Sequence, residues 1–498
     1  MTSPDDDELP IRFHPLSNGE YDPLPRSELI HETVRRTFDT ADTNARRLGM
    51  DRRRFLRTAA GMATTLTTLA ACSAEQRAAT TSRGSTSPTA SSGANSSTSS
   101  VPVGTGGTFE LPPESTLEEE AATTVLEARD GELVIDVQTH LLDYPAGTTT
   151  GFGFGFPQAS CGLDPAECLG VDSWLSLVLG GSDTTVAVLS AIPVVADPDP
   201  LSAAVMDSAR RQAEAVGCLD RVLIQGHATP TLGTLDQAMD AMAATATEFD
   251  IAAWKAYTHE GPAWRLDDTV GTAFCNQARA LGQQVICVHK GLGPAAASPV
   301  DVGPAAVAHP DLAFCIYHSG FERSVTEGPY PGVEAGLGSG GVDRLIASAE
   351  QVGVGVGGNV YPELGSTWWN LIQRPDEAAH VLGKLLVAFG EDNILWGTDS
   401  LWYGSPQSQI EAFRAFQITD EFQERFGYPA LTDAVKAKIL GLNAARVYGI
   451  DPALTNCQPS LDDRAALRRA VDTTGIHGPT TRREAMALFA SEHPWFRS

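Results

Sequence analysis

Short β-branched segments alternate with longer helical stretches from Glu132 onward, and this alternation limits the possible folds more than any other feature of the chain. Apolar strands separated by helices are typical of a parallel sheet covered by helices. The predicted strands are Leu133–Val137, Thr185–Leu189, Arg221–Gln225, Ala252–Tyr257, Gln284–Val288, Ala313–Tyr317, Gly353–Gly357 and Asn393–Trp396. The predicted helices include Pro200–Val216, Thr234–Phe249, Asp267–Leu281, Val342–Val352 and Pro375–Phe389. Eight such units in about 320 residues favour a closed (β/α)8 barrel of the α/β class.

An open, doubly wound sheet is the alternative, and it would need a glycine-rich turn that binds phosphate. The one candidate, Gly353–Gly358, reads GxGxxG but is followed by Asn359-Val360-Tyr361-Pro362 and not by a helix start. The context of a nucleotide-binding turn is therefore missing. We interpret Gly353–Gly357 as a closely packed barrel strand and Leu431–Tyr448 as the helix that closes the barrel.

The charge of the chain excludes several classes of partner. Its 62 acidic and 35 basic side chains give a formal net charge of −27. Nucleic acid and anionic lipid surfaces attract basic proteins, so neither is expected to bind this chain. No run of about 18 strongly apolar residues occurs, which excludes a protein with several membrane spans. The eight cysteines include no CxxC pair, which argues against zinc ribbons and thioredoxin-like sites.

An export signal is predicted over residues 51–72. Asp51–Arg57 contains most of a twin-arginine motif, and the weakly apolar run Thr58–Ala71 has the length of a signal core. The run ends in Leu69-Ala70-Ala71-Cys72, which resembles the cleavage box of bacterial lipoproteins. The twin-arginine translocase is then a partner, and lipidated Cys72 anchors the protein on the outer face of the cytoplasmic membrane. Either Met50 is the true start, or residues 1–50 form a pre-signal region.

The remaining boundaries follow from composition. We expect the N-terminal export region to be disordered and the Ser- and Thr-rich stretch Ser73–Thr116 to be a flexible tether. The barrel is expected over residues 117–455, followed by a helical tail over 456–498 that packs on the barrel or on a partner subunit. Outside the cytoplasm Cys161 and Cys168 form a bridge or remain free thiols. The five cysteines expected to be packing residues are Cys218, Cys275, Cys287, Cys315 and Cys457.

Polar residues gather at the ends of the predicted strands, where the active site of a parallel barrel lies. The first strand leads to Gln138 and His140, the fifth to His289, the sixth to His318 and the eighth to Asp399. Gln138 and His140 are two residues apart, so both side chains point to one face. Imidazole and carboxylate are the usual ligands of zinc and similar ions. We therefore predict that one divalent ion is held by Gln138, His140, His289 and Asp399.

The predicted chemistry follows from that ion. A bound metal lowers the pKa of its water to near neutral, so hydroxide forms without a strong base. Asp399 is placed to take the proton of that water, and His318 to polarise a substrate carbonyl or protonate a leaving group. The structural alternatives are that the histidines are packed core residues and that Asp399 caps a helix.

In this order, the residues resemble the amidohydrolase superfamily, and most closely the amidohydrolase-related branch that includes the aminocarboxymuconate-semialdehyde-type decarboxylases. The resemblance covers about residues 133–450, and the runs that carry it are Ile135–His140, Val288-His289, Tyr317–Gly320, Leu395–Ser400 and Ile439–Gly449. It implies a distorted TIM barrel of the metal-dependent hydrolase type with one divalent metal, often zinc. It also implies metal contacts at His140, His289 and Asp399 and a catalytic histidine at His318.

Two residues bear on the metal. The family usually has His-x-His on the first strand, whereas this chain has Gln138 in the first position. An amide oxygen is a weaker ligand than imidazole, so metal affinity falls, another ion such as manganese or iron is preferred, or Gln138 binds substrate instead. Binuclear relatives have a carboxylated lysine on the fourth strand, where Lys255 lies. Because Gln138 replaces the first histidine of the His-x-His motif, we favour a single ion. Lys255 then pairs with a carboxylate or with substrate.

We expect an enzyme that acts on a small organic substrate. The predicted substrate-binding residues are Lys255, His259 and Trp402, and aromatic side chains at the mouth suit a flat or apolar molecule. The first hypothesis is a metal-dependent hydrolase of an ester, lactone or amide bond. The second is a metal-dependent decarboxylase of an aromatic or unsaturated acid, and the third is an exported binding barrel without catalysis. The substrate is left open, and so is the oligomeric state, with a homo-oligomer among the possibilities.

Overall fold

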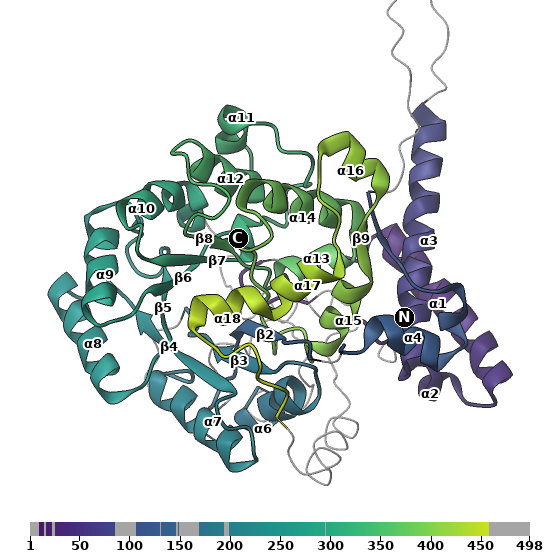
Figure 1. Ribbon diagram of the computed structural model, residues 1–498, viewed down its shortest axis with the longest axis horizontal. Helices are drawn as coiled ribbons and strands as arrows, with labels where there is room; N and C mark the ends of the chain where they lie inside the picture. The colour runs from purple at the N-terminus through teal and green to yellow at the C-terminus, as the bar shows by residue number, and fades with distance from the viewer. Residues whose placement is uncertain are drawn as a thin grey trace, which may run out of the picture.

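A parallel sheet of seven strands forms the centre of the molecule (Figure 1). The computed structural model describes residues 9–13, 16–21, 25–84, 106–129, 131–145, 148, 169–193, 199–293 and 295–457. The strands follow one another in chain order, each parallel to the next. They are β2 (Ile135–Thr139), β3 (Val186–Leu189), β4 (Val222–Ala228), β5 (Ala253–Tyr257), β6 (Val285–His289), β7 (Ala313–Tyr317) and β8 (Val360–Pro362).

The segment Leu395–Ser400 closes this sheet between β8 and β2. Leu395 forms a parallel bridge with Glu363, which follows β8, and Ser400 forms one with Thr139 of β2. Between the bridges, the Asp399 amide donates a 2.9 Å hydrogen bond to the Gln138 carbonyl. The predicted (β/α)8 barrel is confirmed, with an eighth strand reduced to these pairings.

Helices surround the strands, as the alternating pattern predicts (Figure 1). The predicted Pro375–Phe389 helix is found with the same bounds, because Pro375 suits its first turn and Gly390 ends it at φ 83°. The helices around the barrel are α6 (Val171–Trp174), α7 (Ala203–Ala215), α8 (Leu235–Glu248), α9 (Thr269–Ala280), α10 (Val302–Ala308), α11 (Val333–Gly338), α12 (Val342–Glu350), α13 (Thr367–Ile372), α14 (Pro375–Phe389), α15 (Gln407–Ala415), α16 (Asp420–Phe426), α17 (Asp433–Ala437) and α18 (Asn443–Tyr448).

The alternation of side chains along each strand separates two apolar layers. Ile135 and Val137 of β2 pack inside the barrel with Val186 and Val188 of β3. Their neighbours Ala187 and Leu189 belong to the layer between strands and helices. The barrel interior is thus filled with side chains, among them the buried polar groups of Gln225 and Lys255 within β4 and β5.

The predicted strand at Gly353–Gly357 is wrong. Gly353 and Gly357 have φ values of 75° and 74°, and Val356 between them is 73 % exposed. Glycine adopts this left-handed conformation at little cost, so the repeat forms a surface turn after α12. The strand is β8, three residues further on, in which Val360 pairs with Phe314 of β7.

Helices also occupy the region in which the sequence predicts disorder and a tether. Helices α1 (Glu28–Leu48), α2 (Arg52–Leu56) and α3 (Ala59–Gly84) lie in this region, and α4 (Glu119–Leu126) follows it. All four lie beside the barrel (Figure 1). Helix α1 buries Ile30, Val34 and Ala41 at helical spacing, and Arg36 pairs with Glu75 of α3 at 2.7 Å. Helix α3 includes residues 73–84 of the expected tether, and β1 (Gly107–Phe109) pairs with β9 (Phe416–Ile418). Within the described residues, no helix is both long and apolar enough to span a membrane.

Two of the cysteines expected to be packing residues are bonded to each other. Cys218, just after α7, forms a disulfide with Cys457, whose Cα lies 4.9 Å away. The two cysteines are 239 residues apart, so the sequence alone does not indicate this pairing. Only the closed barrel brings the two segments together. Cys275, Cys287 and Cys315 are buried free thiols, as predicted. Cys161, Cys168 and most of the tail lie outside the described residues.

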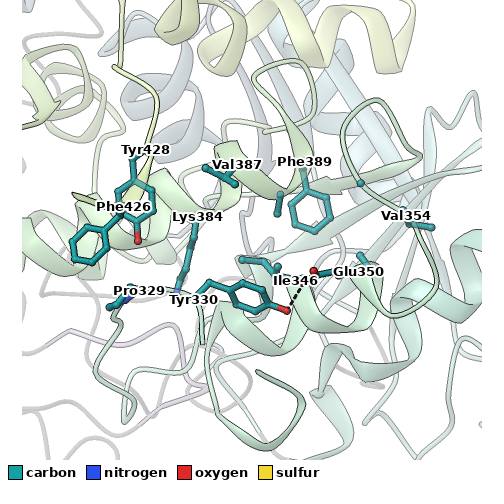
Figure 2. Close-up of a pocket in the computed structure, with 13 residues that line it drawn as sticks. Pro329, Tyr330, Ile346, Glu350, Val354, Lys384, Val387, Phe389, Phe426 and Tyr428 are labelled. Atoms are coloured by element: carbon teal, nitrogen blue, oxygen red, sulfur yellow. Dashed lines mark hydrogen bonds between the residues drawn. The ribbon is translucent and has the colours of Figure 1, made fainter. Parts of the chain in front are cut away.

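A hollow of about 470 Å³ lies between α12 and α14 (Figure 2), and none of the predicted site residues lines it. Tyr330, Phe389 and Phe426 give it apolar walls, and Tyr330 donates a 2.7 Å hydrogen bond to Glu350. Lys384 lines one wall, with its ammonium buried against Glu327 at 2.5 Å and Asp343 at 2.6 Å.

We expect Lys384→Met to lower the free energy of unfolding by about 3–5 kcal/mol, because it leaves two carboxylates without their cation. Urea denaturation measures this change. The matched control is Lys438→Met, since Lys438 pairs with Glu391 and Asp392 at the surface, and such pairs contribute less than about 1 kcal/mol. Equal losses in the two variants would contradict the prediction.

Candidate metal centre

The predicted polar residues lie together at the carboxyl ends of the barrel strands. His140 follows β2, His289 ends β6, and His318 follows β7. Asp399 lies in the closing segment, and its backbone is paired with Gln138. All five side chains are buried, although each could ionise or form hydrogen bonds. Buried polar groups in one place indicate a functional site more strongly than scattered ones.

Each of the three imidazoles is oriented by a backbone carbonyl. His140 Nδ1 donates to Ser190 O at 2.7 Å, His289 Nε2 to Gly291 O at 3.0 Å, and His318 Nδ1 to Gly365 O at 2.7 Å. A carbonyl can only accept, so these nitrogens carry the hydrogens and the other nitrogen of each neutral ring presents a lone pair. This second hydrogen bond is typical of metal-binding histidines.

His140 and Gln138 meet Asp399 on one side of the site. The Nε2 atom of His140 is 2.9 Å from Asp399 Oδ1, and the Gln138 amide donates to the same oxygen at 3.1 Å. A neutral His140 would direct its lone pair at the carboxylate, so the contact requires a proton or a cation between the two atoms. Burial opposes the charge of Asp399, but the hydrogen bond and charge of His140 hold the pKa of Asp399 below its ordinary value.

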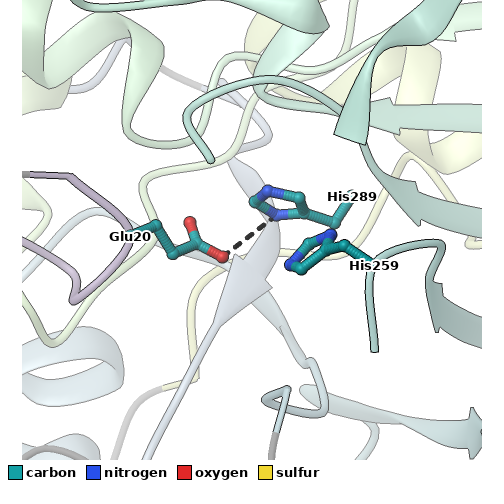
Figure 3. Close-up of side chains that lie close together, drawn as sticks. All are labelled: Glu20, His259 and His289. Atoms are coloured by element: carbon teal, nitrogen blue, oxygen red, sulfur yellow. Dashed lines mark ion pairs between the residues drawn. The ribbon is translucent and has the colours of Figure 1, made fainter. Parts of the chain in front are cut away.

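Glu20 lies on the other side, although the sequence analysis places it in the pre-signal region. Its Oε1 atom is 3.2 Å from His289 Nδ1 (Figure 3). Its Oε2 atom is 3.8 Å from His318 Nε2. Glu20, His259 and His289 have donor atoms within 4.8 Å of one another, the one such group of His, Cys, Asp and Glu found in the described part of the chain. Burial and the charge of Asp399 raise the pKa of Glu20 to about 8.

The predicted ligand set is thus divided between two sides. Gln138, His140 and Asp399 are in contact, whereas His289 lies with Glu20 and His259. Asn18 links the sides, because its amide donates to Asp399 Oδ2 at 3.0 Å and to Glu20 Oε2 at 2.6 Å. No feature of the sequence marks Asn18 or Glu20, since they reach the barrel across more than 100 residues of chain.

The predicted substrate-binding residues all border this site. Trp402 stacks on His140 with ring centroids 5.5 Å apart, and its indole donates to Asp399 at 3.1 Å. His259 contacts His289 edge-on at 4.9 Å, so it belongs to the group that could hold a metal. Lys255 points its ammonium at the Tyr317 ring, 3.5 Å from the centroid, and burial lowers the pKa of Lys255 to about 8.

Glu363 is a second site residue that the sequence does not indicate, because it follows β8 and the sequence predicts that strand at Gly353–Gly357. Its carboxyl accepts hydrogen bonds from the His318 amide at 3.0 Å and from the Gly365 amide at 2.6 Å. It therefore fixes both His318 and the residue whose carbonyl orients the His318 ring. His318 and Asp399 have φ values of 65° and 60°. Each costs about 1–3 kcal/mol in a residue other than glycine, so the surrounding contacts must hold them.

The fold and the buried His and Asp cluster define a barrel with its candidate functional site at the carboxyl ends of the strands. The chain belongs to the amidohydrolase family, whose model matches residues 135–450.

The solved structures that resemble the chain are distant in sequence. An uncharacterised TIM-barrel protein of Bordetella bronchiseptica is 18 % identical, covering 64 % of this chain and 99 % of its own, with a TM-score of 0.40. The 5-carboxyvanillate decarboxylase of Sphingomonas paucimobilis is 14 % identical, with coverages of 64 % and 100 % and a TM-score of 0.39. The decarboxylase of Novosphingobium aromaticivorans, solved with manganese, is 12 % identical, with coverages of 64 % and 97 % and a TM-score of 0.38. A search of curated proteins finds no match to the chain.

The residues present fit a divalent cation. The buried Nδ1 of His289 and the buried Oε1 of Gln138 have no hydrogen-bond partner among the described residues. Burial lowers the pKa of His289 well below its ordinary value and that of His318 to about 4, so both rings are neutral at pH 7. Neutral imidazole, carboxylate and amide oxygen together match zinc, manganese or iron(II).

Gln138→Glu should raise the affinity for Zn²⁺ or Mn²⁺ at least about tenfold, because a carboxylate replaces a neutral amide beside Asp399. In the metal-free protein the same change places two carboxylates together and destabilises the fold. The shift in melting temperature on adding metal, measured by calorimetry, should therefore be larger than in the unchanged protein. A smaller shift would place Gln138 outside the ligand set.

Proposed function

We propose that the chain is a metal-dependent hydrolase that acts on an ester, lactone or amide bond of a small organic substrate. The proposal rests chiefly on three buried imidazoles, each held by a carbonyl, at the same strand ends as a carboxylate whose pKa is kept low. His140, His289 and Asp399 would hold the ion, with Gln138 as a weaker contact. A divalent ion bound there lowers the pKa of water and polarises a carbonyl oxygen.

Asp399 acts as the proton acceptor. Its carboxylate is ionised at neutral pH, and the indole of Trp402 and the hydroxyl of Ser366 donate to it and fix its plane. It accepts a proton from the attacking water and returns it to the leaving oxygen or nitrogen. The positive φ of Asp399 turns the side chain back over the strand end, toward His140.

His318 is the second group that handles a proton. Because Nδ1–H is engaged with Gly365, the neutral ring presents Nε2 to the site as an acceptor. It can donate to a leaving group only after it has taken a proton. The backbone amide of His318 donates to Glu363, so Glu363 positions this ring without contacting substrate.

A decarboxylase is the second candidate, and the placement of Glu20 favours it. The site accommodates a carboxylate between His289 and His318, which is the group that a carboxylated substrate would bring. Turnover in ¹⁸O-labelled water distinguishes the two reactions. A hydrolase incorporates one labelled oxygen into the product acid, whereas a decarboxylase releases one CO₂ and leaves the organic product unlabelled.

Asp399→Asn should lower kcat by about 10²–10⁴-fold on the substrate found by screening esters, lactones and carboxylated aromatics, because the amide cannot accept a proton. The variant is close in shape, so circular dichroism should show an unchanged fold. Turnover within threefold of the unchanged enzyme would exclude Asp399 as the base.

We also propose export by the twin-arginine route, supported by Arg52 and Arg53 ahead of the weakly apolar start of α3. Replacing both arginines with lysine should retain the protein in the cytoplasm, since the translocase reads the arginine pair. Cell fractionation measures the distribution. Arg46→Lys with Arg47→Lys, an arginine pair within α1, is the matched control and should leave export unchanged.

A further inference from the structure

The chain inserts its own N-terminal segment, Leu16–Tyr21, into the mouth of the barrel. Leu16, Ser17 and Asn18 are buried, and the Tyr21 hydroxyl lies 2.7 Å from that of Tyr403. These contacts span more than 380 residues of sequence. A surface loop that only rested on the barrel would leave its polar side chains in water, whereas Asn18 and Glu20 place theirs against the predicted metal ligands.

The distances around Glu20 are those of atoms that share one ion. Two ligands about 2.1 Å from a tetrahedral metal lie roughly 3.4 Å apart. Glu20 lies 3.2 Å from His289 Nδ1 and 3.8 Å from His318 Nε2. The Nδ1 atoms of His259 and His289 are buried and have no hydrogen-bond partner among the described residues.

The carboxyl groups on either side of Asn18 also indicate a cation site. The NH₂ group of Asn18 is held between Asp399 Oδ2 and Glu20 Oε2, at 3.0 and 2.6 Å, where a cation would be shared by the two carboxylates. Asp399 is the one anion in the predicted ligand set, and Gln138 adds only a neutral amide. Glu20 would supply a second carboxyl oxygen, a ligand that zinc, manganese and iron(II) all accept.

We propose that Glu20 is a ligand of the metal, so that the bound ion fastens the N-terminal segment in the mouth of the barrel. The inference rests on the metal dependence of the proposed function. Metal affinity and the exposure of the segment are therefore linked. A bound ion stabilises the docked position of residues 16–21, and a change that weakens this docking also lowers the affinity for the ion.

Isothermal titration of the metal-free full chain with Mn²⁺ tests the first half of the proposal. Glu20→Gln should weaken binding at least tenfold, and Glu20→His, which restores a donor atom, should recover part of the loss. Glu322→Gln is the matched control, because Glu322 pairs with Arg344 outside the cluster and should leave Mn²⁺ binding unchanged. Affinity in Glu20→Gln that equals or exceeds that of the unchanged chain overturns the proposal.

Hydrogen–deuterium exchange of residues 16–21 tests the second half on the unmutated protein. Saturating Mn²⁺ should slow exchange there at least tenfold, and the effect should be lost in Glu20→Gln. If Mn²⁺ leaves exchange in this segment unchanged, the proposal is overturned even where a variant fails to fold. Both readouts are independent of turnover, so a folded chain that binds Mn²⁺ through Glu20 but hydrolyses nothing would refute the proposed function and keep this inference.

Discussion

The site depends on the pairing of the closing segment with β2. The bridge between Thr139 and Ser400, together with the hydrogen bond from Asp399 N to Gln138 O, brings a carboxylate from the end of the barrel sequence against an imidazole from its start. Asp136 strengthens this pairing, since its carboxyl accepts hydrogen bonds from the Thr398 amide at 3.0 Å and from the Thr398 hydroxyl. Without the pairing of β2 with the closing segment, the barrel would be an open sheet and His140 would have no anionic partner.

Several residues beside the pairing of β2 with the closing segment have backbone conformations that lower the stability of the fold. His318, Ser366 and Asp399 all have left-handed backbones that are unfavourable for their residue types, and all three are within the cluster. Glu363 is buried among them, and burial raises its pKa well above the usual range. Positive φ values also occur elsewhere, as at Asp220, but three of them fall on residues of this cluster. A site held in one geometry requires surrounding contacts of this kind.

The sequence was enough to predict the barrel and the residues at its strand ends. Seven strand positions could be located because β-branched runs and helical periodicity are local signals, and His140, His289, His318 and Asp399 could be placed because parallel strands all end at one face. The strand predicted at Gly353–Gly357 is wrong because the sequence pattern does not show that two of these glycines have positive φ. The Cys218–Cys457 disulfide and the contacts of Asn18 and Glu20 are long-range, and a single sequence carries no local trace of such pairs.

Cys72 is buried in the middle of α3, on the side that packs toward α1, and Thr33 of α1 forms a hydrogen bond with it. A peptidase or acyltransferase could reach this thiol only after α3 had separated from α1. Cleavage there would also remove Asn18 and Glu20, together with their contacts to Asp399 and His289. A chain trimmed at Cys72 and an untrimmed chain would therefore differ at this site, one with Glu20 beside the histidines and one without it.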